Sequence, residues 1–468
     1  MDYNKLYING QFVKANSNEY IEVENPSNRK IIGKVPRGNS EDVNNAVNAA
    51  FEAFKTWKNT SIEERIEIIE KFKEYIENNL EKIANIITEE QGSPVNFAQN
   101  NQVRNNINRI NAYINIAKNF KFEEELGVGR VRYEPVGVVA CLTPWNFPMG
   151  QIIQKIVPAI LSGCTVVLKP SQIAPLTSYY IVEGLHEAGL PKGVLNLVTG
   201  KGREVGNVLA EHKLVNKVSF TGSTEGGKEV AKTALNTVKK ITLELGGKSP
   251  AIFLDNSNIE IGVKRIFTSL FGNCGQTCVA FSRAIVIKDV KDEVIAEIIK
   301  QYSKLVVGNP KDINTNVGPL VSEKQFKKVK KYIELGIEEG ANIILGEIPR
   351  EYENGYFIKP VIFDKVNNNM TIAREEIFGP VLSIIEVENI EEAIEIANDT
   401  IYGLSAGVYG KDEIAQKVAR EINSGEVYIN KDSSDAYLPF GGYKQSGLGR
   451  EAGIFGFKEF LEVKSLIG

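Results

Sequence analysis

The feature that most constrains the fold is a regular alternation of two kinds of segment from about Pro135 onward. Short apolar runs, such as VGVVACL and TVVLKP, are followed by longer stretches with helical periodicity, such as Gly150–Leu161 and Thr177–Glu187. The apolar runs lack polar alternation, which is typical of strands buried on both faces. Strands and helices that alternate in this way form a parallel sheet covered by helices on both sides. The sequence therefore predicts an α/β fold.

The same alternation continues along the rest of the chain. Further strands are predicted at VLNLVTG, KVSFTG and ITLELGG, with a helix at Glu225–Leu235. A second succession follows, with strands RAIVIK, NIILG, YFIKPVIF, VLSIIEV, SAGVYG and GEVYIN and helices at Val290–Val306, Glu323–Gly340, Glu391–Asn398 and Glu413–Ile422. Because 468 residues are too many for one core, we expect two or three domains. We place one boundary near Gly246–Gly247.

The region before Pro135 has a different pattern and is predicted to be mainly helical. Apolar residues recur at spacings of three and four in three segments, Glu41–Trp57, Ser61–Asn78 and Leu80–Gln91. Ser61 followed by Glu64 matches a capping box at the start of the second helix. Two other segments, 120–133 and 457–467, are extended alternations of apolar and charged residues. They suit a hairpin arm and a terminal strand that contact another subunit.

Composition and charge exclude several classes of protein. The net charge is −4 with both signs interspersed, so no nucleic-acid partner is predicted. The chain begins without the basic and apolar regions of a signal peptide, and no apolar run reaches the roughly 18 residues that a membrane span needs. Four cysteines in so long a chain do not form a disulfide framework. We therefore expect a cytoplasmic protein without a membrane partner.

Histidine and metal chemistry are also excluded. The chain has two histidines, and His186 and His212 each stand in a charged, helix-like context without a second histidine at metal-ligand spacing. Histidine-based triads and histidine-ligated zinc are therefore poor candidates. Cys274 and Cys278 are spaced CxxxC with no second pair nearby, so no metal site is predicted.

Two segments carry a candidate nucleophile and a candidate base. Cys278 lies in GNCGQTCVAFSR, in a turn of small residues between a helix-like run and a strand-like run. Glu244 ends the apolar strand ITLELGG, just before a glycine pair. Taken alone, a cysteine is more often a buried structural thiol, and most carboxylates are simply solvated. Together, a thiol nucleophile and a carboxylate base could form and then hydrolyse a thioester.

Three further motifs follow predicted strands, where ligands of open α/β sheets bind. FTGSTEGGK opens a helix whose glycine-rich N-terminus suits a phosphate or is a structural turn. It is not a Walker A loop, because Glu229 follows Lys228 where Ser or Thr is required. Lys169 in LKPSQ is placed for a nucleotide or is a solvated loop lysine. Asn146 in TPWNFP could donate to an oxyanion, or it could belong to a prolyl turn around Trp145.

The order of these motifs carries more weight than any one of them. TPWNFP, KPSQ, FTGSTEGG, LELGGKSP, GQTCVAFSR, EEIFGPV and PFGGYKQSGLGRE follow one another at these spacings. Each of the last two, taken alone, is a loop lining a cleft or merely a turn. In combination, the chain resembles the aldehyde dehydrogenase superfamily over essentially its whole length, from YINGQFV near the start to EVKSL near the end.

The resemblance implies a three-part architecture and a covalent mechanism. A dinucleotide-binding Rossmann-like domain would comprise residues 1–118 and 136–246, an α/β catalytic domain 247–445, and a small β oligomerisation arm 119–135 and 446–468. Cys278 would be the nucleophile, Glu244 the base, Asn146 the oxyanion donor together with the Cys278 N–H, and Lys155 an aid to proton transfer. The implied reaction oxidises an aldehyde to a carboxylic acid with NAD(P), through a thiohemiacetal and a thioester that is then hydrolysed.

The resemblance also assigns residues to the cofactor, NAD or NADP. They are Thr143, Trp145, Lys169, Ser171, Gln172, Gly202, Gly222, Ser223, Gly227, Leu245, Gly246, Glu376 and Phe378. Among them, Glu376 would bind the nicotinamide ribose. Gln172 departs from the glutamate that NAD-preferring members often carry at this position. Neutral glutamine removes the repulsion of a 2′-phosphate, so we expect NADP to be tolerated or preferred.

Several points stay open at the level of sequence. Glu244 favours hydrolysis over transfer to coenzyme A, because acylating members commonly lack this base. A CoA-acylating enzyme and a catalytically inactive nucleotide-binding or structural relative are the alternatives. The aldehyde channel is expected at residues 432–438, where two acids disfavour an anionic substrate, and at Met149, Phe281 and Phe440. The aldehyde itself is not determined, nor is the choice between homodimer and homotetramer.

Overall fold

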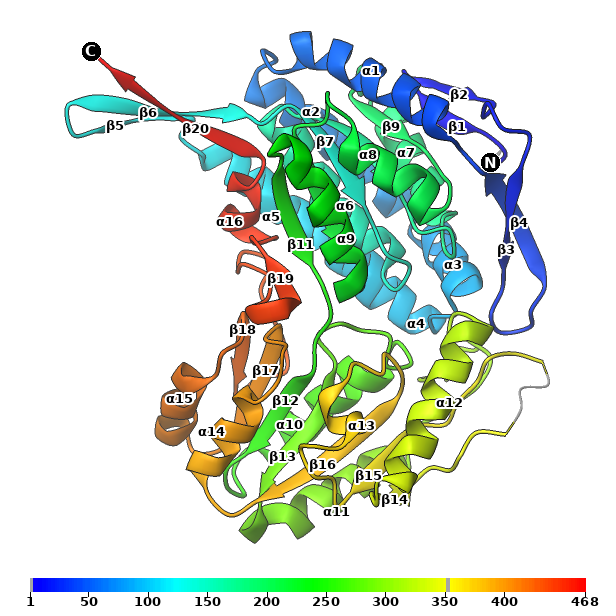
Figure 1. Cartoon of the computed structure of the whole chain (residues 1–468), viewed down its shortest axis with the longest axis vertical. Coiled ribbons are helices and arrows are strands. Elements are labelled where there is room, and N and C mark those ends of the chain that lie inside the picture. Colours follow the sequence, from blue (N-terminus) through cyan, green and yellow to red (C-terminus); the bar gives the residue numbers. More distant parts are fainter. Residues whose placement is uncertain (1–2, 351–353) are drawn as a thin grey trace.

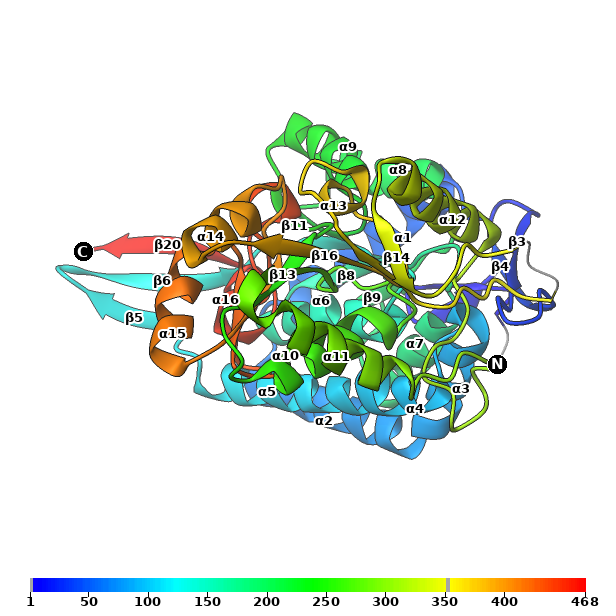
Figure 2. The same cartoon turned by 90° about the horizontal axis from the view of Figure 1, so that it is seen from below.

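The computed structural model describes residues 3–350 and 354–468. Two α/β layers, each made of one sheet and the helices that cover it, lie one above the other in Figure 1. They are joined at one side by β11 and by the segment that contains β19 and α16. A narrow arm of three strands projects from the first layer, and the same arm stands out in the view from below in Figure 2. The α/β fold class predicted from the sequence is confirmed, because each layer contains a largely parallel sheet covered by helices.

The first sheet has the strand order β19-β11-β10-β7-β8-β9-β1-β2. Its five central strands are parallel and coincide with the predicted apolar runs: β7 (Val138–Leu142), β8 (Thr165–Lys169), β9 (Leu195–Leu197), β10 (Lys217–Thr221) and β11 (Lys240–Glu244). The residues of β7 and β8 are all buried. That burial explains why their sequences show no alternation of polar residues.

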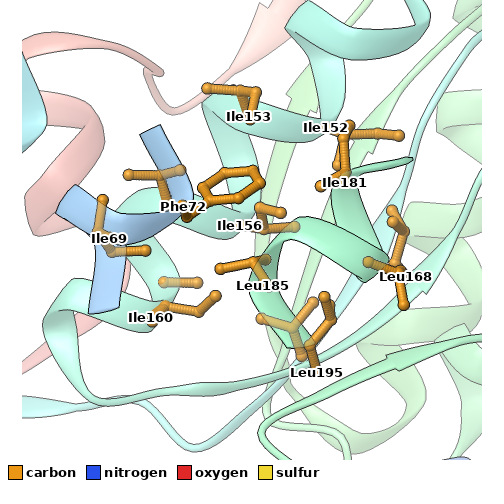
Figure 3. Close-up of a cluster of buried hydrophobic side chains, with 14 of the residues drawn as sticks. Ile69, Phe72, Ile152, Ile153, Ile156, Ile160, Leu168, Ile181, Leu185 and Leu195 are labelled. Carbon is orange, nitrogen blue, oxygen red and sulfur yellow. The ribbon is translucent and has the colours of Figure 1, made fainter. Parts of the chain in front are cut away.

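Helices cover both faces of this sheet. One face is packed by α6 (Pro148–Ser162) and α7 (Thr177–Glu187), with α2 (Ile62–Asn78), α3 (Leu80–Gln91) and α5 (Asn105–Asn119) outside them. Figure 3 shows the apolar core between these helices and the strands, with Phe72 and Ile156 near its centre. The other face is packed by α1 (Ser40–Trp57), α8 (Asn207–Glu211) and α9 (Thr224–Ala234).

The capping box predicted before α2 is present. The Ser61 side chain accepts a hydrogen bond from the Glu64 backbone N–H at 3.3 Å, and the Glu64 carboxylate accepts one from the Ser61 backbone N–H at 3.1 Å. These bonds stabilise the ionised carboxylate, so the pKa of Glu64 lies below its ordinary value. The helix therefore begins at Ile62 because two of its free N-terminal donors find partners there.

The second sheet has the order β14-β15-β16-β13-β12-β17-β18. Its strands are β12 (Ser249–Phe253), β13 (Phe281–Ile287), β14 (Asn342–Leu345), β15 (Val361–Asp364), β16 (Val381–Val387), β17 (Ser405–Tyr409) and β18 (Glu426–Ile429). The covering helices are α10 (Ile259–Ile266), α11 (Lys291–Tyr302), α12 (Glu323–Glu338), α13 (Thr371–Arg374), α14 (Ile390–Asn398) and α15 (Asp412–Glu421). β12 was not predicted, and β15 is shorter than the predicted YFIKPVIF strand.

The region before Pro135 opens with four strands that precede its helices, so its prediction as mainly helical was incomplete. The strands are β1 (Leu6–Ile8), β2 (Gln11–Val13), β3 (Tyr20–Glu24) and β4 (Ile31–Pro36), and the region also holds α5 and the short α4 (Val95–Phe97). β1 and β2 form a hairpin whose turn residues Asn9 and Gly10 have φ values of 52° and 79°. An Asn-Gly pair favours this turn because both positions need positive φ.

The projecting arm consists of a hairpin and a strand from near the C-terminal end. β5 (Glu123–Leu126) pairs with β6 (Gly129–Pro135), and β6 pairs along its length with β20 (Leu461–Ile467). The predicted extended segments are therefore strands, except that α16 (Gly453–Lys458) continues to Lys458. β19 (Gly447–Leu448) pairs with β11 in the first sheet. Among the described residues, no helix combines the length and apolar character needed to cross a membrane.

Candidate active site

Four strands of the first sheet end at one edge, where three present a predicted site residue and the fourth presents Thr221, just before the predicted Gly222. Thr143 follows β7, Lys169 ends β8, Thr221 ends β10 and Glu244 ends β11. The register places Leu142 opposite Lys169 and Thr221 opposite Glu244. Carboxyl ends of parallel strands are where open α/β sheets bind ligands. The residues predicted separately from the sequence thus lie along one edge of the sheet.

The candidate nucleophile lies in the loop that leads into β13. Cys278 is partly exposed, whereas Cys274 is buried. The loop packs closely on the segment after β11, because a Cβ on Gly247 would lie 2.4 Å from the Cys278 carbonyl oxygen. Burial raises the pKa of the Cys278 thiol, and the carboxylates of Glu376 and Glu244 raise it further. The thiol is therefore protonated at neutral pH and needs a base to become a nucleophile.

Asn146 is held against the nucleophile loop by a set of amide hydrogen bonds. Its side-chain Nδ2 donates to the Gln276 carbonyl at 3.0 Å, and the Asn273 side chain donates to the Asn146 carbonyl at 2.9 Å. The Gln91 side chain in turn donates to Asn273 Oδ1 at 3.1 Å. All four side chains are buried. A primary amide has two N–H donors, so Asn146 keeps one that does not bond to Gln276.

Glu244 is buried, and its carboxyl group accepts no hydrogen bonds. The residue is 2% exposed, and neither carboxylate oxygen has a hydrogen-bond partner among the described residues. Burial raises its pKa well above the ordinary value; the Glu451 charge raises it further, whereas Lys155 and Arg450 lower it. Gly441 packs against it, since a Cβ there would lie 2.7 Å from Glu244 Oε1. A carboxyl group with a raised pKa and free oxygens is suited to accept a proton.

Lys155 is part of a buried ion pair that the sequence did not reveal. Its ammonium donates to Glu451 Oε1 and, at 2.6 Å, to Thr221 Oγ1. Lys155 is 0% exposed and Glu451 3% exposed. Ser219 also donates to Glu451, whose second oxygen has no partner among the described residues. The pair lies close enough to Glu244 for both of its charges to act on that carboxyl.

One cavity of about 350 Å³ joins the nucleophile to predicted cofactor residues. It is lined by Pro144, Trp145, Asn146, Ile173, Thr221, Gly222, Ser223, Leu245, Gly246, Cys278, Ser322, Lys324, Gln325, Lys328, Glu376 and Phe378. Phe378 has a φ of 60° and meets Trp145 edge to face at 5.4 Å. Glu376 accepts a hydrogen bond from the Gly247 N–H at 3.0 Å, and burial raises its pKa. A Cβ on Gly246 would lie 2.5 Å from that carboxylate.

A second cavity, of about 180 Å³, adjoins the first at Thr221. Its lining includes Thr143, Lys169, Gly202 and the N-terminal turn of α9, together with Arg203, which the sequence did not single out. Burial lowers the pKa of Lys169 to about 8, and Lys169 forms no ion pair within the described part of the chain. Buried Thr143 Oγ1 likewise has no partner there. Free polar atoms beside a helix N-terminus suit an anionic, hydroxyl-bearing ligand.

The remaining predicted residues have other surroundings. Gly227 packs on Leu245, where a Cβ would lie 2.4 Å from Leu245 Cδ2. Ser171 accepts a hydrogen bond from Ile173, and Gln172 is half-buried, but neither lines the two cavities.

The predicted channel residues do not form one surface. Met149 and Phe281 are 0% exposed, and Phe281 packs against Tyr428. Phe440 is half-buried in a two-residue bridge to Glu451. Asp432 is paired with Lys264 at 2.7 Å, so it offers no free negative charge to a substrate.

Comparison with known proteins agrees with this geometry over nearly the whole chain. The model of the family described as "Aldehyde dehydrogenase family" matches residues 12–466. The chain belongs to the aldehyde dehydrogenase family. A putative aldehyde dehydrogenase of Staphylococcus aureus (strain MSSA476) is 46% identical over 470 residues, which cover 100% of this chain and 99% of that protein. The protein is therefore an enzyme, an oxidoreductase, as its ordered motifs predicted.

Solved structures of aldehyde dehydrogenases have the same fold. A mutant of aldehyde dehydrogenase C from Pseudomonas syringae, in complex with NAD+ and octanal, is 41% identical with a TM-score of 0.97 and covers 99% of this chain and 96% of that one. An NAD+ complex of aldehyde dehydrogenase from Bacillus cereus is 37% identical with a TM-score of 0.96, again covering 99% and 96%. The predicted fold class is thus that of solved aldehyde dehydrogenases.

Proposed function

We propose that this aldehyde dehydrogenase oxidises an aldehyde to a carboxylic acid with NAD(P), through a covalent intermediate on Cys278. The observation that carries the proposal is the single cavity that holds Cys278, Asn146 and Glu376, with the Glu244 carboxyl close enough to shift the pKa of the thiol. A nucleophile and an oxyanion donor thus line one space in which an aldehyde carbon can be attacked, and the charge of a candidate base acts on the nucleophile.

The first step is attack of the Cys278 sulfur on the aldehyde carbon. Because the thiol is protonated at neutral pH, its proton must pass to a base, and Glu244 has a raised pKa and two free oxygens to receive it. The oxyanion of the tetrahedral species can accept hydrogen bonds from the free Asn146 N–H and from the Cys278 backbone N–H. One such preorganised donor is typically worth about 3 kcal/mol of barrier.

The residues at the strand ends fit NAD(P). Lys169 would bind a ribose or phosphate oxygen, and Ser223 with the α9 N-terminus would face the phosphates. Glu376 would accept hydrogen bonds from ribose hydroxyls, with Gly246 leaving space for it and Phe378 beside the nicotinamide. When bound, the cofactor supplies the hydride acceptor that converts the tetrahedral species into a thioester on Cys278.

Hydrolysis of the thioester completes the proposed reaction. Glu244 would first release the thiol proton to solvent, and its freed carboxylate would then deprotonate the attacking water. The charges of the buried Lys155–Glu451 pair would assist these transfers by acting on the pKa of Glu244. Glu244 favours this route over transfer of the acyl group to coenzyme A. A nucleotide-binding relative without catalysis is disfavoured, since Cys278, Glu244 and Asn146 are all present and hydrogen bonds hold Asn146 against the Cys278 loop.

We further propose that the enzyme accepts NADP as well as NAD. Gln172 carries no charge that would repel a 2′-phosphate, and the guanidinium of Arg203 lines the cavity at Lys169. The Pseudomonas syringae and Bacillus cereus relatives are complexed with NAD+. The three-part domain division, a homo-oligomeric state and a cytoplasmic location, all inferred from the sequence, belong to the same proposal.

The decisive experiment compares wild type with Cys278→Ala and Cys274→Ala. NAD(P)H formation from an aldehyde panel is followed by absorbance, and binding of NAD and NADP is measured separately. We expect Cys278→Ala to lose turnover at least about 10³-fold while it still binds nucleotide. Cys274→Ala should keep most of the activity. Unchanged turnover in Cys278→Ala would refute its role, and acyl-CoA as the main product in the presence of coenzyme A would refute the hydrolytic branch.

A further inference from the structure

Helices α5 and α6 form a wall behind Asn146 that carries buried polar atoms without partners. Gln151 Oε1, Gln154 Nε2 and Arg109 Nε are buried and have no hydrogen-bond partner among the described residues. Gln151 is 8% exposed and Gln154 4% exposed. Buried polar atoms in native proteins nearly always find a partner, so these three atoms are available to bond a polar group that reaches the wall.

The contacts of the two helices place these atoms together. The Arg109 guanidinium donates to Asn106 Oδ1 at 2.8 Å, and Asn106 Nδ2 lies 3.2 Å from where a Cβ on Gly150 would stand. One turn further along, Tyr113 donates to the Gln154 carbonyl at 3.3 Å. Gln154 lies four residues after Gly150, on the same side of α6, and Gln151 lies one turn before Gln154.

A free carboxyl group adds to this polar region from the second sheet. Glu426 begins β18 and is half-buried, and its carboxylate forms no hydrogen bond or ion pair with any described residue. Its neighbour Gly425 packs on Gly441, because a Cβ on Gly425 would lie 1.6 Å from the Gly441 carbonyl oxygen. Gly441 in turn packs on Glu244. Burial raises the pKa of Glu426 to about 7, while the charges of Arg265 and Arg109 act to lower it.

These four groups lie outside the cofactor cavities. Arg109, Gln151, Gln154 and Glu426 line neither the 350 Å³ cavity nor the 180 Å³ cavity. α6 nevertheless begins at Pro148, two residues after Asn146, and the Glu426 charge acts on both Cys278 and Glu244. The groups therefore lie beside the reacting centre on a side that the cofactor cavities do not occupy. The part of an aldehyde substrate beyond its carbonyl group must lie on that same side.

The chemistry of the groups selects among classes of aldehyde. Arg109 and Gln154 offer donors, whereas Gln151 and Glu426 offer acceptors. An apolar chain would leave all of them unpaired, and a cationic aminoaldehyde would face the guanidinium groups of Arg109 and Arg265. An anionic semialdehyde would face Glu426. A neutral hydroxyl group, which both donates and accepts, matches the whole set.

We propose that the substrates of this enzyme are small neutral hydroxyaldehydes, whose hydroxyl groups are bound by Arg109, Gln151, Gln154 and Glu426. This inference rests on the proposed aldehyde oxidation and extends it to a substrate class. A site built to bond a hydroxyl rejects the analogue that lacks it, because its buried polar groups then stay unpaired. The free polar atoms on the wall are the determinant of specificity in this account.

The test uses pairs of aldehydes that differ by one hydroxyl group. kcat/KM with NAD and with NADP is measured for 2-hydroxypropanal against propanal and for glycolaldehyde against acetaldehyde, with octanal as an apolar probe. We expect at least about a tenfold preference for the hydroxylated member of each pair. Equal or better use of propanal or octanal overturns the substrate class, whereas oxidation of none of these aldehydes counts against the proposed function itself.

Variants then assign the preference to residues. Gln151→Leu, Gln154→Leu and Glu426→Gln are compared with Asn111→Leu, a matched substitution on the exposed face of α5. We expect the first three to lower the ratio of kcat/KM between the hydroxylated and the plain aldehyde about fivefold or more, and Asn111→Leu to leave that ratio unchanged. A purely structural role would lower kcat/KM for both members alike, so an unchanged ratio in all three variants rejects the assignment even if activity falls.

Discussion

At the scale of single residues, Glu244 is proposed to act twice, before acylation of Cys278 and again before hydrolysis. Glu244→Gln keeps the shape of the side chain but cannot accept a proton. We expect both the rate of the first NAD(P)H burst and the steady rate to fall, the steady rate about 10²–10⁴-fold, because the thiol and the attacking water both lose their base. Stopped-flow absorbance measures both phases. A normal steady rate would show that another group activates the water.

Lys169 gives a prediction about pH. Its pKa is lowered to about 8 by burial, so the ammonium is largely charged below pH 8 and largely neutral above it. A charged lysine attracts the anionic cofactor, and bound phosphate in turn favours the charged form. We therefore expect the Kd for NAD(P) to rise, up to about tenfold, between pH 7 and pH 9.5. Titration by protein fluorescence measures it, and Lys169→Met should flatten the profile; a parallel rise in that variant would contradict the role.

At the scale of elements, the junction between β11 and β12 fixes the nucleophile loop. A Cβ on Gly247 would lie 2.4 Å from the Cys278 carbonyl, which belongs to the backbone and cannot rotate away. Gly247→Ala should therefore displace the loop, lower kcat more than tenfold and cost about 1–3 kcal/mol of stability. Gly308→Ala is the control, since a Cβ there would lie 3.4 Å from its nearest neighbour, the Thr315 hydroxyl. Equal kcat and Tm for both variants would contradict the packing argument.

The same elements show what a sequence can and cannot predict. Strands such as β7 and β8 are predictable because burial on both faces leaves an apolar run. β1 and β2 have three residues each, too few to show a period of two, and β12 was missed although its five residues are all buried. Glu451 stayed unassigned because it meets Lys155 across 296 positions of the chain, a contact that no local pattern encodes. The Gln276 carbonyl and Asn273 were missed for the same reason.

At the scale of the whole molecule, the projecting arm is the part whose edge strands and apolar side chains are left uncovered. Its order is β20-β6-β5, so β20 and β5 are both edge strands, and open edges invite pairing or need cover. Its apolar side chains are also exposed: Val463 is 64% exposed, Leu126 69%, Val128 94% and Ile467 89%. A second copy of the chain that covers this surface would bury these side chains, which is the expected basis of a homo-oligomer.

This arrangement predicts which substitutions dissociate the oligomer. Val463→Asp places a charge on the exposed face of β20, where burial in an interface would remove it from water at a large cost. We expect the variant to shift toward monomer by light scattering after size exclusion, with an unchanged helical content. Ile299→Asp is the control, because Ile299 is 48% exposed on α11, outside the arm. If wild type is a monomer at micromolar concentration, or if both variants dissociate alike, the arm is not the interface, and its exposed apolar strands need another partner.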